Sequence, residues 1–178
     1  MKGVRMFFPS RLAAALLTLA ISGHVLAGFE EDYESKQWQE VEVQLPVAPK
    51  DETLQSFYVS AASKNRFLID LATLSVGNDG VVRYVLLVIT PEGGRNVTFE
   101  GMRCESREHR IYASGRRDGS WSKSRNNDWS RIQDAYANRQ HAALFQEYFC
   151  PGGVIVRDEF EAKNALRSGE HPYNKRSR

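Results

Sequence analysis

Ten consecutive residues, 81–90, read Val-Val-Arg-Tyr-Val-Leu-Leu-Val-Ile-Thr, and nearly all of them are β-branched, aromatic or aliphatic. Such residues favour an extended strand, and a strand that is apolar on both faces has to be covered on both sides. The sequence Gly-Asn-Asp-Gly at residues 77–80 precedes the run and suits a tight turn. The run therefore predicts the central strand of a sheet with a layer on each face.

Further strands are predicted on both sides of this run. Residues 41–45 alternate apolar and polar side chains, and in residues 67–72 the large apolar Phe67, Ile69 and Leu71 alternate with Leu68, Asp70 and Ala72. Residues 56–60, 96–104 and 110–116 are short strand-like stretches. Short turns at residues 91–94 and 118–119 connect the later strands. Successive strands with tight turns are typical of an antiparallel meander rather than of a parallel βαβ sheet.

Residues 96–104 contain a change of face. Val97 and Phe99 have one parity, whereas Met102 and Cys104 have the other. A β-bulge at Gly101, which lies between the two pairs, would bring all four side chains onto the same face. We therefore expect a bulge at that glycine.

The hydrophobic period changes after residue 129. Ser130 and Gln133 fit a capping box, which predicts one main helix over residues 130–149 that ends before Pro151. Residues 154–156 read as a last short strand and residues 158–166 as a short amphipathic helix. The predicted fold is a single α+β domain over residues 28–166, with five or six antiparallel strands covered by the main helix. The basic tail, residues 167–178, is expected to be disordered.

The first 27 residues have the pattern of a secretory signal. Lys2, Arg5 and Arg11 are basic, an apolar run of 11 residues follows, and residues 25–27 suit a cleavage site after Ala27. The alternative is a retained membrane anchor, but 11 residues span only about 16 Å as a helix, roughly half of the hydrocarbon layer. We therefore expect cleavage, an exported mature protein, and no transmembrane segment afterwards.

Removal of the signal changes the net charge. Three of the 24 basic residues lie in the signal and none of the 22 acidic ones does, so the mature chain has 21 basic and 22 acidic residues. A near-neutral exported chain offers no general case for binding nucleic acid.

Two cysteines, Cys104 and Cys150, remain after cleavage. In an oxidising compartment an isolated pair most often forms a disulfide, and no Cys-x-x-Cys spacing points to redox chemistry. We therefore expect a structural bridge.

One region carries local positive charge. Between residues 103 and 131 there are eight basic residues against four acidic ones, interleaved with aromatic side chains. Arginines beside tryptophan or tyrosine can bind an anionic or carbohydrate ligand by paired hydrogen bonds, cation-π contacts and stacking. The alternatives are a solvated edge hairpin with both tryptophans in the core, or a surface covered by the acidic residues 30–34 of the same chain. The predicted binding residues are Arg110, Tyr112, Arg116, Arg117, Trp121, Arg125 and Trp129.

Catalytic and metal motifs are absent from the sequence. His109 could act as a general base with Glu105, but a solvent-exposed histidine at the start of a strand is the simpler interpretation. His141 is expected to pack in the helix or lie on its surface. With three histidines after cleavage and no spaced partner, we expect no zinc site and no cofactor.

Seven segments stand together in the chain, at residues 67–70, 75–77, 79–84, 96–97, 100–104, 115–121 and 148–150. With these segments the chain resembles the cryptic neisserial protein-like family of small exported proteobacterial proteins, over about residues 29–156. The resemblance implies a single exported domain with a periplasmic location in a Gram-negative envelope, and it brings no catalytic residues with it. From the basic, aromatic region between Tyr112 and Trp129 we expect a non-enzymatic periplasmic binding module for an anionic envelope component or a protein partner. The alternative is an envelope hydrolase or sugar-modifying enzyme that uses His109, Glu105 or Asp128.

Overall fold

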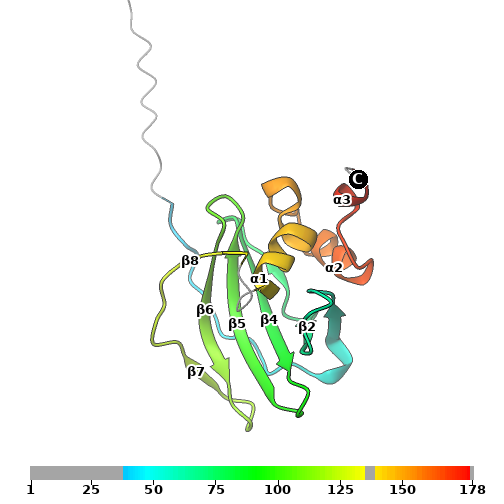
Figure 1. The fold of residues 1–178 in the computed structure, drawn as a ribbon. Coiled ribbons are helices and arrows are strands. Elements are labelled where there is room, and N and C mark those ends of the chain that lie inside the picture. The colour runs from blue at the N-terminus through cyan, green and yellow to red at the C-terminus, as the bar shows by residue number, and fades with distance from the viewer. Residues whose placement is uncertain (1–37, 135–138, 177–178) are drawn as a thin grey trace, which may run out of the picture. The chain divides into compact units, whose positions relative to one another are not determined.

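The computed structural model describes residues 38–134 and 139–176, which belong to one compact unit that begins at Trp38. The strands in these residues form one antiparallel sheet in the order β1-β2-β4-β5-β6-β7, with β3 paired to β4 and β8 paired to β6 (Figure 1). The α+β class is confirmed, and the two-residue strands β3 and β8 raise the strand count above the expected five or six. The strands are β1 (Leu54–Phe57), β2 (Arg66–Asp70), β3 (Ser75–Val76), β4 (Val81–Ile89), β5 (Arg95–Arg103), β6 (Glu108–Gly115), β7 (Trp121–Lys123) and β8 (Ser130–Arg131).

β4 is the central strand that its composition predicts. Its first seven residues are all buried, because both faces of the sheet are covered. Val82, Tyr84 and Leu86 face the main hydrophobic core, which lies between the sheet and the helices. Val85 points to the opposite face, where it joins a smaller cluster with Phe99 and Tyr112. We call these the helix-covered face and the arm-covered face.

An extended arm, residues 38–50, covers the second face. The prediction of a strand at residues 41–45 is wrong, because no residue of this arm has regular secondary structure. Figure 1 shows the arm passing behind the strands while α1 lies in front of them. Val43 packs against the smaller cluster, and Trp121 donates its indole N–H to the Pro46 carbonyl at 2.7 Å. The arm is therefore held by side-chain contacts with a sheet face, not by a strand ladder.

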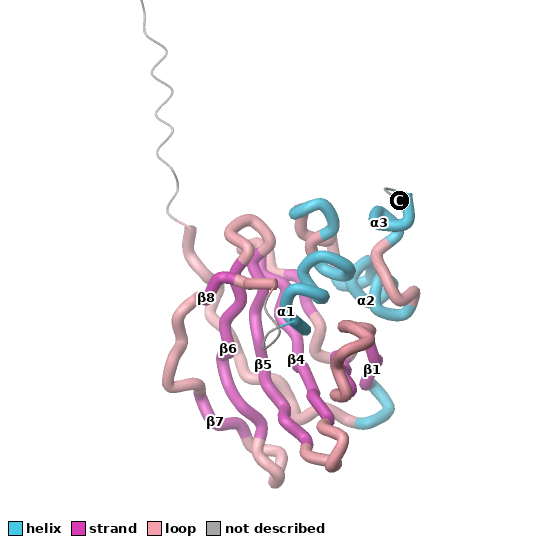
Figure 2. The backbone as a smooth tube through the Cα atoms, in the orientation of Figure 1, coloured by secondary structure: helices cyan, strands magenta, loops and turns pink. Residues whose placement is uncertain are grey.

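The main helix does not begin at Ser130 as predicted, and residues 135–138 of the predicted helix lie outside the described residues. Ser130 does not cap a helix but pairs with His109 in β8, so a ladder with β6 replaces the local capping box. α1 (Arg139–Ala143) continues directly into a π-helical turn at Leu144–Phe149, in which the Cys150 N–H reaches the Phe145 carbonyl five residues back. Figure 2 shows the long loop that leads from β7 to β8 at the edge of the sheet.

The disulfide between Cys104 and Cys150 is confirmed, with the two Cα atoms 5.5 Å apart. Both cysteines are buried in the main core. The bridge joins the residue after β5 to the residue after the π-helical turn, so it ties the sheet to the layer that covers it.

The β-bulge lies on β6 and not at Gly101. β4 and β5 pair in unbroken register, whereas the register of β5 with β6 shifts between Phe99 and Glu100 so that Tyr112 has no partner. The two parities of β5 therefore stay on different faces, because both faces have a core to join. Gly101 has another role: a Cβ there would lie 2.3 Å from the Tyr112 hydroxyl oxygen.

The C-terminal region is more ordered than expected. α2 (Glu159–Arg167) confirms the short helix, and the Asp158 side chain caps it by accepting from the Glu161 N–H at 2.8 Å. A 3-10 turn (Pro151–Gly153) leads into residues 154–156, which are not a strand. The expected disordered tail contains α3 (Pro172–Arg176), and His171 before it is buried beside Glu161 at 3.1 Å. A 3-10 turn (Asp51–Thr53) precedes β1.

Candidate functional site

The seven residues predicted to bind a ligand fall into two groups. Arg116, Arg117 and Arg125 are exposed in the turn after β6 and the loop after β7. The other four, which are Arg110, Tyr112, Trp121 and Trp129, are buried or half-buried on the arm-covered face and at its rim. The arm makes contact with all four of them.

A carboxylate of the arm occupies the centre of this face. Glu40 accepts a hydrogen bond from the Tyr112 hydroxyl at 2.5 Å and forms an ion pair with Arg110. Its other contact is the Arg83 guanidinium at 3.4 Å. The side chain of Glu40 is only 15% exposed, so three donors enclose the carboxylate.

Asp79 and two tryptophans hold the start of the arm. The Asp79 side chain accepts from the Val41 N–H at 2.9 Å and pairs with Arg83 at 2.5 Å. Burial by itself would raise the pKa of Asp79, but the hydrogen bonds and the charge of Arg83 outweigh it and lower that pKa. Trp38 donates to the Asp79 carbonyl at 2.7 Å and meets Trp129 edge to face, with ring centroids 5.9 Å apart.

Two arginine guanidinium groups also lie over these tryptophan rings. The Arg103 guanidinium lies 3.7 Å from the centroid of the Trp38 ring, and Arg110 lies 5.6 Å from that of Trp129. The acidic residues 30–34, which we expected as a possible cover, lie outside the described residues. Within the described chain an acidic residue of the arm, Glu40, makes that kind of contact.

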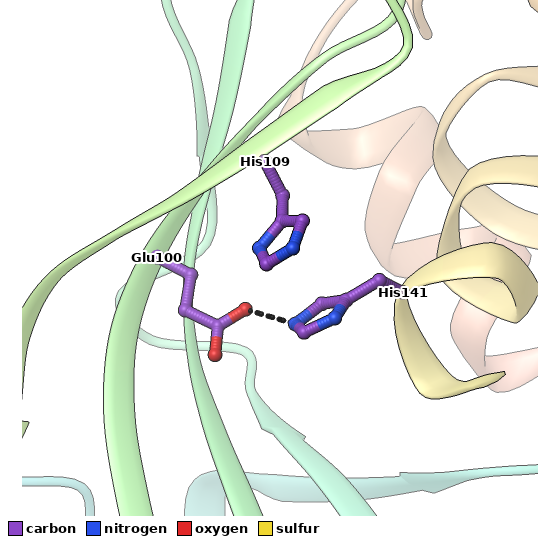
Figure 3. A group of neighbouring side chains, drawn as sticks. All are labelled: Glu100, His109 and His141. Atoms are coloured by element: carbon purple, nitrogen blue, oxygen red, sulfur yellow. Dashed lines mark hydrogen bonds and ion pairs between the residues drawn. The ribbon is translucent and has the colours of Figure 1, made fainter. Parts of the chain in front are cut away.

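A second group of polar side chains lies inside the helix-covered face. Glu100 of β5, His109 of β6 and His141 of α1 point toward one another (Figure 3). His141 Nε2 pairs with Glu100 Oε2 at 2.8 Å. The rings of His109 and His141 stack with centroids 3.8 Å apart. The expectation of a solvent-exposed His109 is wrong, because the strand places this side chain between the sheet and α1.

The surroundings fix the charges of this group. Glu100 is fully buried, which would raise its pKa, but His141 and the hydroxyl of Thr98 at 2.6 Å lower it, so the carboxylate is ionised. The Tyr84 hydroxyl also donates to this carboxylate, at 3.2 Å. Burial and the neighbouring His141 lower the pKa of His109 to about 4. His109 is therefore a neutral imidazole at physiological pH.

The partners suggested for His109 lie elsewhere. Glu105 and Asp128 are exposed, in the turn before β6 and in the loop before β8. The charged residues that sequence reasoning missed are Glu100, Arg83 and Glu40. Arg83 carried a signal, since it is a charged side chain within the otherwise apolar β4, whereas Glu100 lies in a strand that also contains Arg95, Asn96, Thr98 and Arg103.

Comparison with known proteins places the chain in a family. A family described as CNP1-like matches residues 33–167. The chain belongs to the CNP1-like family. It is also 24% identical over 174 residues to Cryptic neisserial protein 1 of Neisseria gonorrhoeae (strain ATCC 700825 / FA 1090), covering 81% of this chain and 86% of that protein. No solved structure matches the chain.

The match to the CNP1-like family covers the arm from its first described residue, both faces of the sheet and α2. Glu40 with its basic partners, and the group of Glu100, His109 and His141, therefore both lie inside the region that matches the family. Among the described residues, no helix is long and apolar enough to cross a membrane.

Proposed function

We propose that this CNP1-like chain is an exported, non-enzymatic binding module of the bacterial envelope, and that its arm-covered face receives an acidic group of a ligand or partner. The observation that carries the proposal is the Glu40 carboxylate, which sits among Arg83, Arg110 and Tyr112. The signal-like N-terminus and the disulfide support export, because such bridges persist mainly in oxidising compartments.

The Glu40 carboxylate occupies the position at which we expect the acidic group of the ligand to bind. Two guanidinium groups and a phenolic hydroxyl converge on one carboxylate, and this donor set also suits a carboxylate or phosphate from another molecule. A ligand with such a group has to displace Glu40. Displacement breaks few backbone hydrogen bonds, because the arm does not form a strand with the sheet.

The surface beside Glu40 offers room and charge. A hollow of about 300 Å³ lies along the arm, lined on the sheet side by Arg110, Tyr112 and Lys123. The exposed Arg116, Arg117 and Arg125 lie in the neighbouring turn and loop, where they raise the local concentration of an anionic ligand. The ligand is therefore expected to bind more weakly as salt increases.

The test uses a fluorescent peptide of residues 38–47 as the probe and the full chain with Glu40→Gln as the receptor. Removal of the internal carboxylate charge is expected to raise affinity for the peptide at least tenfold over wild type. A peptide with glutamine at position 40 should lose this gain, and so should a chain that also carries Arg110→Gln. The matched control is Glu42→Gln, since Glu42 is an exposed glutamate of the same arm. Equal affinity of the wild-type and Glu40→Gln chains for the peptide refutes the proposal.

A second candidate function is the envelope hydrolase or sugar-modifying enzyme. The observation that favours it is the buried pair of Glu100 and His141 with His109 stacked beside it, since perturbed histidine and carboxylate groups occur at catalytic sites. The exposed fractions of Glu100 and His141 are 1% and 4%, so a substrate reaches them only if the helix layer opens. Hydrolysis of envelope glycans by wild type but not by Glu100→Gln would favour this candidate over binding.

A further inference from the structure

Three metal-ligating side chains converge on the helix-covered face, away from the arm. Glu100, His109 and His141 each place one ligating atom within 4.8 Å of the others. They come from β5, β6 and α1, so the sheet and the helix layer both contribute (Figure 3). We propose that these residues bind one divalent transition-metal ion of the zinc class. Two imidazoles and one carboxylate form a donor set found in zinc sites.

Unpartnered nitrogens support a ligand at this place. Nδ1 of His109 and Nδ1 of His141 are buried and have no hydrogen-bond partner among the described residues. Buried polar atoms are nearly always paired in folded proteins, because an unpaired one keeps its desolvation cost. His141 is only 4% exposed. An imidazole of His109 with an unpartnered buried nitrogen is unexpected in an interior built for packing alone, and an ion bound at that nitrogen would give it a partner.

The carboxylate is already oriented for an ion. The Thr98 hydroxyl donates to Glu100 Oε1 at 2.6 Å, which leaves Oε2 directed at His141 Nε2 at 2.8 Å. Hydrogen bonds that orient a ligand from behind are a regular feature of metal sites. An ion between Glu100 Oε2 and His141 Nε2 would take the place of the proton that the two groups share.

One ring has to turn when the ion binds. The His109 and His141 rings are stacked at an angle of 18°, whereas an ion lies close to the plane of each imidazole that it binds. Rotation of His109 about its Cβ–Cγ bond resolves this, since that torsion has a broad energy profile. His141 is held by Glu100, and His109 has no comparable hydrogen bond at its buried Nδ1. Metal binding should therefore unstack the two rings.

The chain contains its own control. His171 is also buried beside a glutamate, with Nε2 3.1 Å from Glu161 Oε1. It pairs with one carboxylate and belongs to no group of three ligands among the described residues. An effect of zinc on histidine–glutamate pairs in general would appear at His171 as well as at the cluster.

The test is a calorimetric titration of the full chain, without a histidine tag and after treatment with EDTA, with Zn²⁺. We expect one ion per wild-type chain, at least tenfold weaker binding in His109→Gln and in His141→Gln, and unchanged binding in His171→Gln. Circular dichroism verifies that each variant is folded. Absence of one-to-one binding by wild type, or an affinity for Zn²⁺ equal to that of wild type in both cluster variants, overturns the proposal.

A measurement on wild type alone covers the case in which a cluster variant does not fold. Zn²⁺ should shift the NMR signals of the His109 and His141 rings and raise the melting temperature, because an ion that binds the folded chain stabilises it. The His171 ring signals should stay in place. Shifts at His171 without shifts at the other two rings would overturn the proposal. The outcome is independent of the arm-covered face, because the two sites lie on opposite sides of the sheet.

Discussion

Substitution of Gly101 by alanine adds one methyl group under the ring of Tyr112. The new Cβ would lie 2.3 Å from the Tyr112 hydroxyl oxygen, 2.9 Å from Cζ and 3.0 Å from Cε2. Gly101 has no positive φ, so its backbone accepts alanine without strain. The whole cost therefore comes from the contact with Tyr112, whose hydroxyl has to move by about 0.7 Å to reach even a tight separation of about 3 Å.

The expected loss of unfolding free energy follows from the contacts that Tyr112 makes. Its ring packs on Phe99 with centroids 5.1 Å apart, and its hydroxyl donates to Glu40 at 2.5 Å. Overpacking costs about 1–3 kcal/mol, and loss of a hydrogen bond to a charged group costs about 1.5–3 kcal/mol. Alanine in place of glycine in a strand returns about 0.5–1 kcal/mol. We therefore expect Gly101→Ala to lower the free energy of unfolding by about 2–4 kcal/mol.

Urea unfolding of four chains measures this: wild type, Gly101→Ala, Tyr112→Ala and the double variant. At about 2 kcal/mol per M of urea, the midpoint of Gly101→Ala should fall by roughly 1–2 M. In the Tyr112→Ala background the same substitution should cost less than about 0.5 kcal/mol, since the ring is gone. Gly94→Ala is the control, because its Cβ would meet only the Thr90 side chain, at 3.1 Å. Equal cost of Gly101→Ala in both backgrounds refutes the reasoning.

Three further outcomes are expected. Replacement of Cys104 and Cys150 by alanine should cost about 4 kcal/mol of unfolding free energy, from a loop closed over a separation of 46 residues; dithiothreitol should then destabilise wild type but not the variant in urea unfolding. Because the pKa of Asp79 is lowered in the folded chain, its carboxylate stabilises the fold above the pKa of the unfolded chain, near 3.8, and this contribution is lost as the pH falls through the folded pKa. In thermal melts the difference in stability between wild type and Asp79→Asn should be largest near pH 7 and shrink below pH 4. A difference that stays constant with pH would contradict this role. Tyr148→Phe should cost about 1 kcal/mol, because the hydroxyl bonds the backbone after β1 at 3.2 and 3.3 Å, and thermal melts that match wild type would contradict that role.

Much of the sheet could be predicted because strands depend on local pattern. The apolar run of β4 and the turn before it determine where that strand begins. The positions of β5, β6 and α2 likewise follow from the residue pattern within each element. The disulfide could be predicted because the expected mature chain has only two cysteines and an oxidising compartment was expected. Each of these inferences needs only residues that are close together or a pair with no alternative.

The failures have one cause, which is competition from distant partners. Ser130 satisfies the capping pattern, but pairing with His109 in β8 places it in a ladder instead. The alternation at residues 41–45 looks like a strand, yet the arm finds its partners in the Asp79, Arg110 and Tyr112 side chains. Local propensity is worth a few tenths to about 1 kcal/mol per residue, and tertiary contacts outweigh it.

By itself the sequence determined an α+β chain with a signal-like N-terminus, a central apolar strand, one disulfide and a basic, aromatic region. Only the tertiary structure decided what those residues touch. It placed Glu40 among basic side chains far along the chain, such as Arg110, and it brought His141 onto Glu100. The physical reason is that a strand pattern specifies which residues face inward, whereas which inward residues meet depends on strand order and on how α1 packs across the sheet.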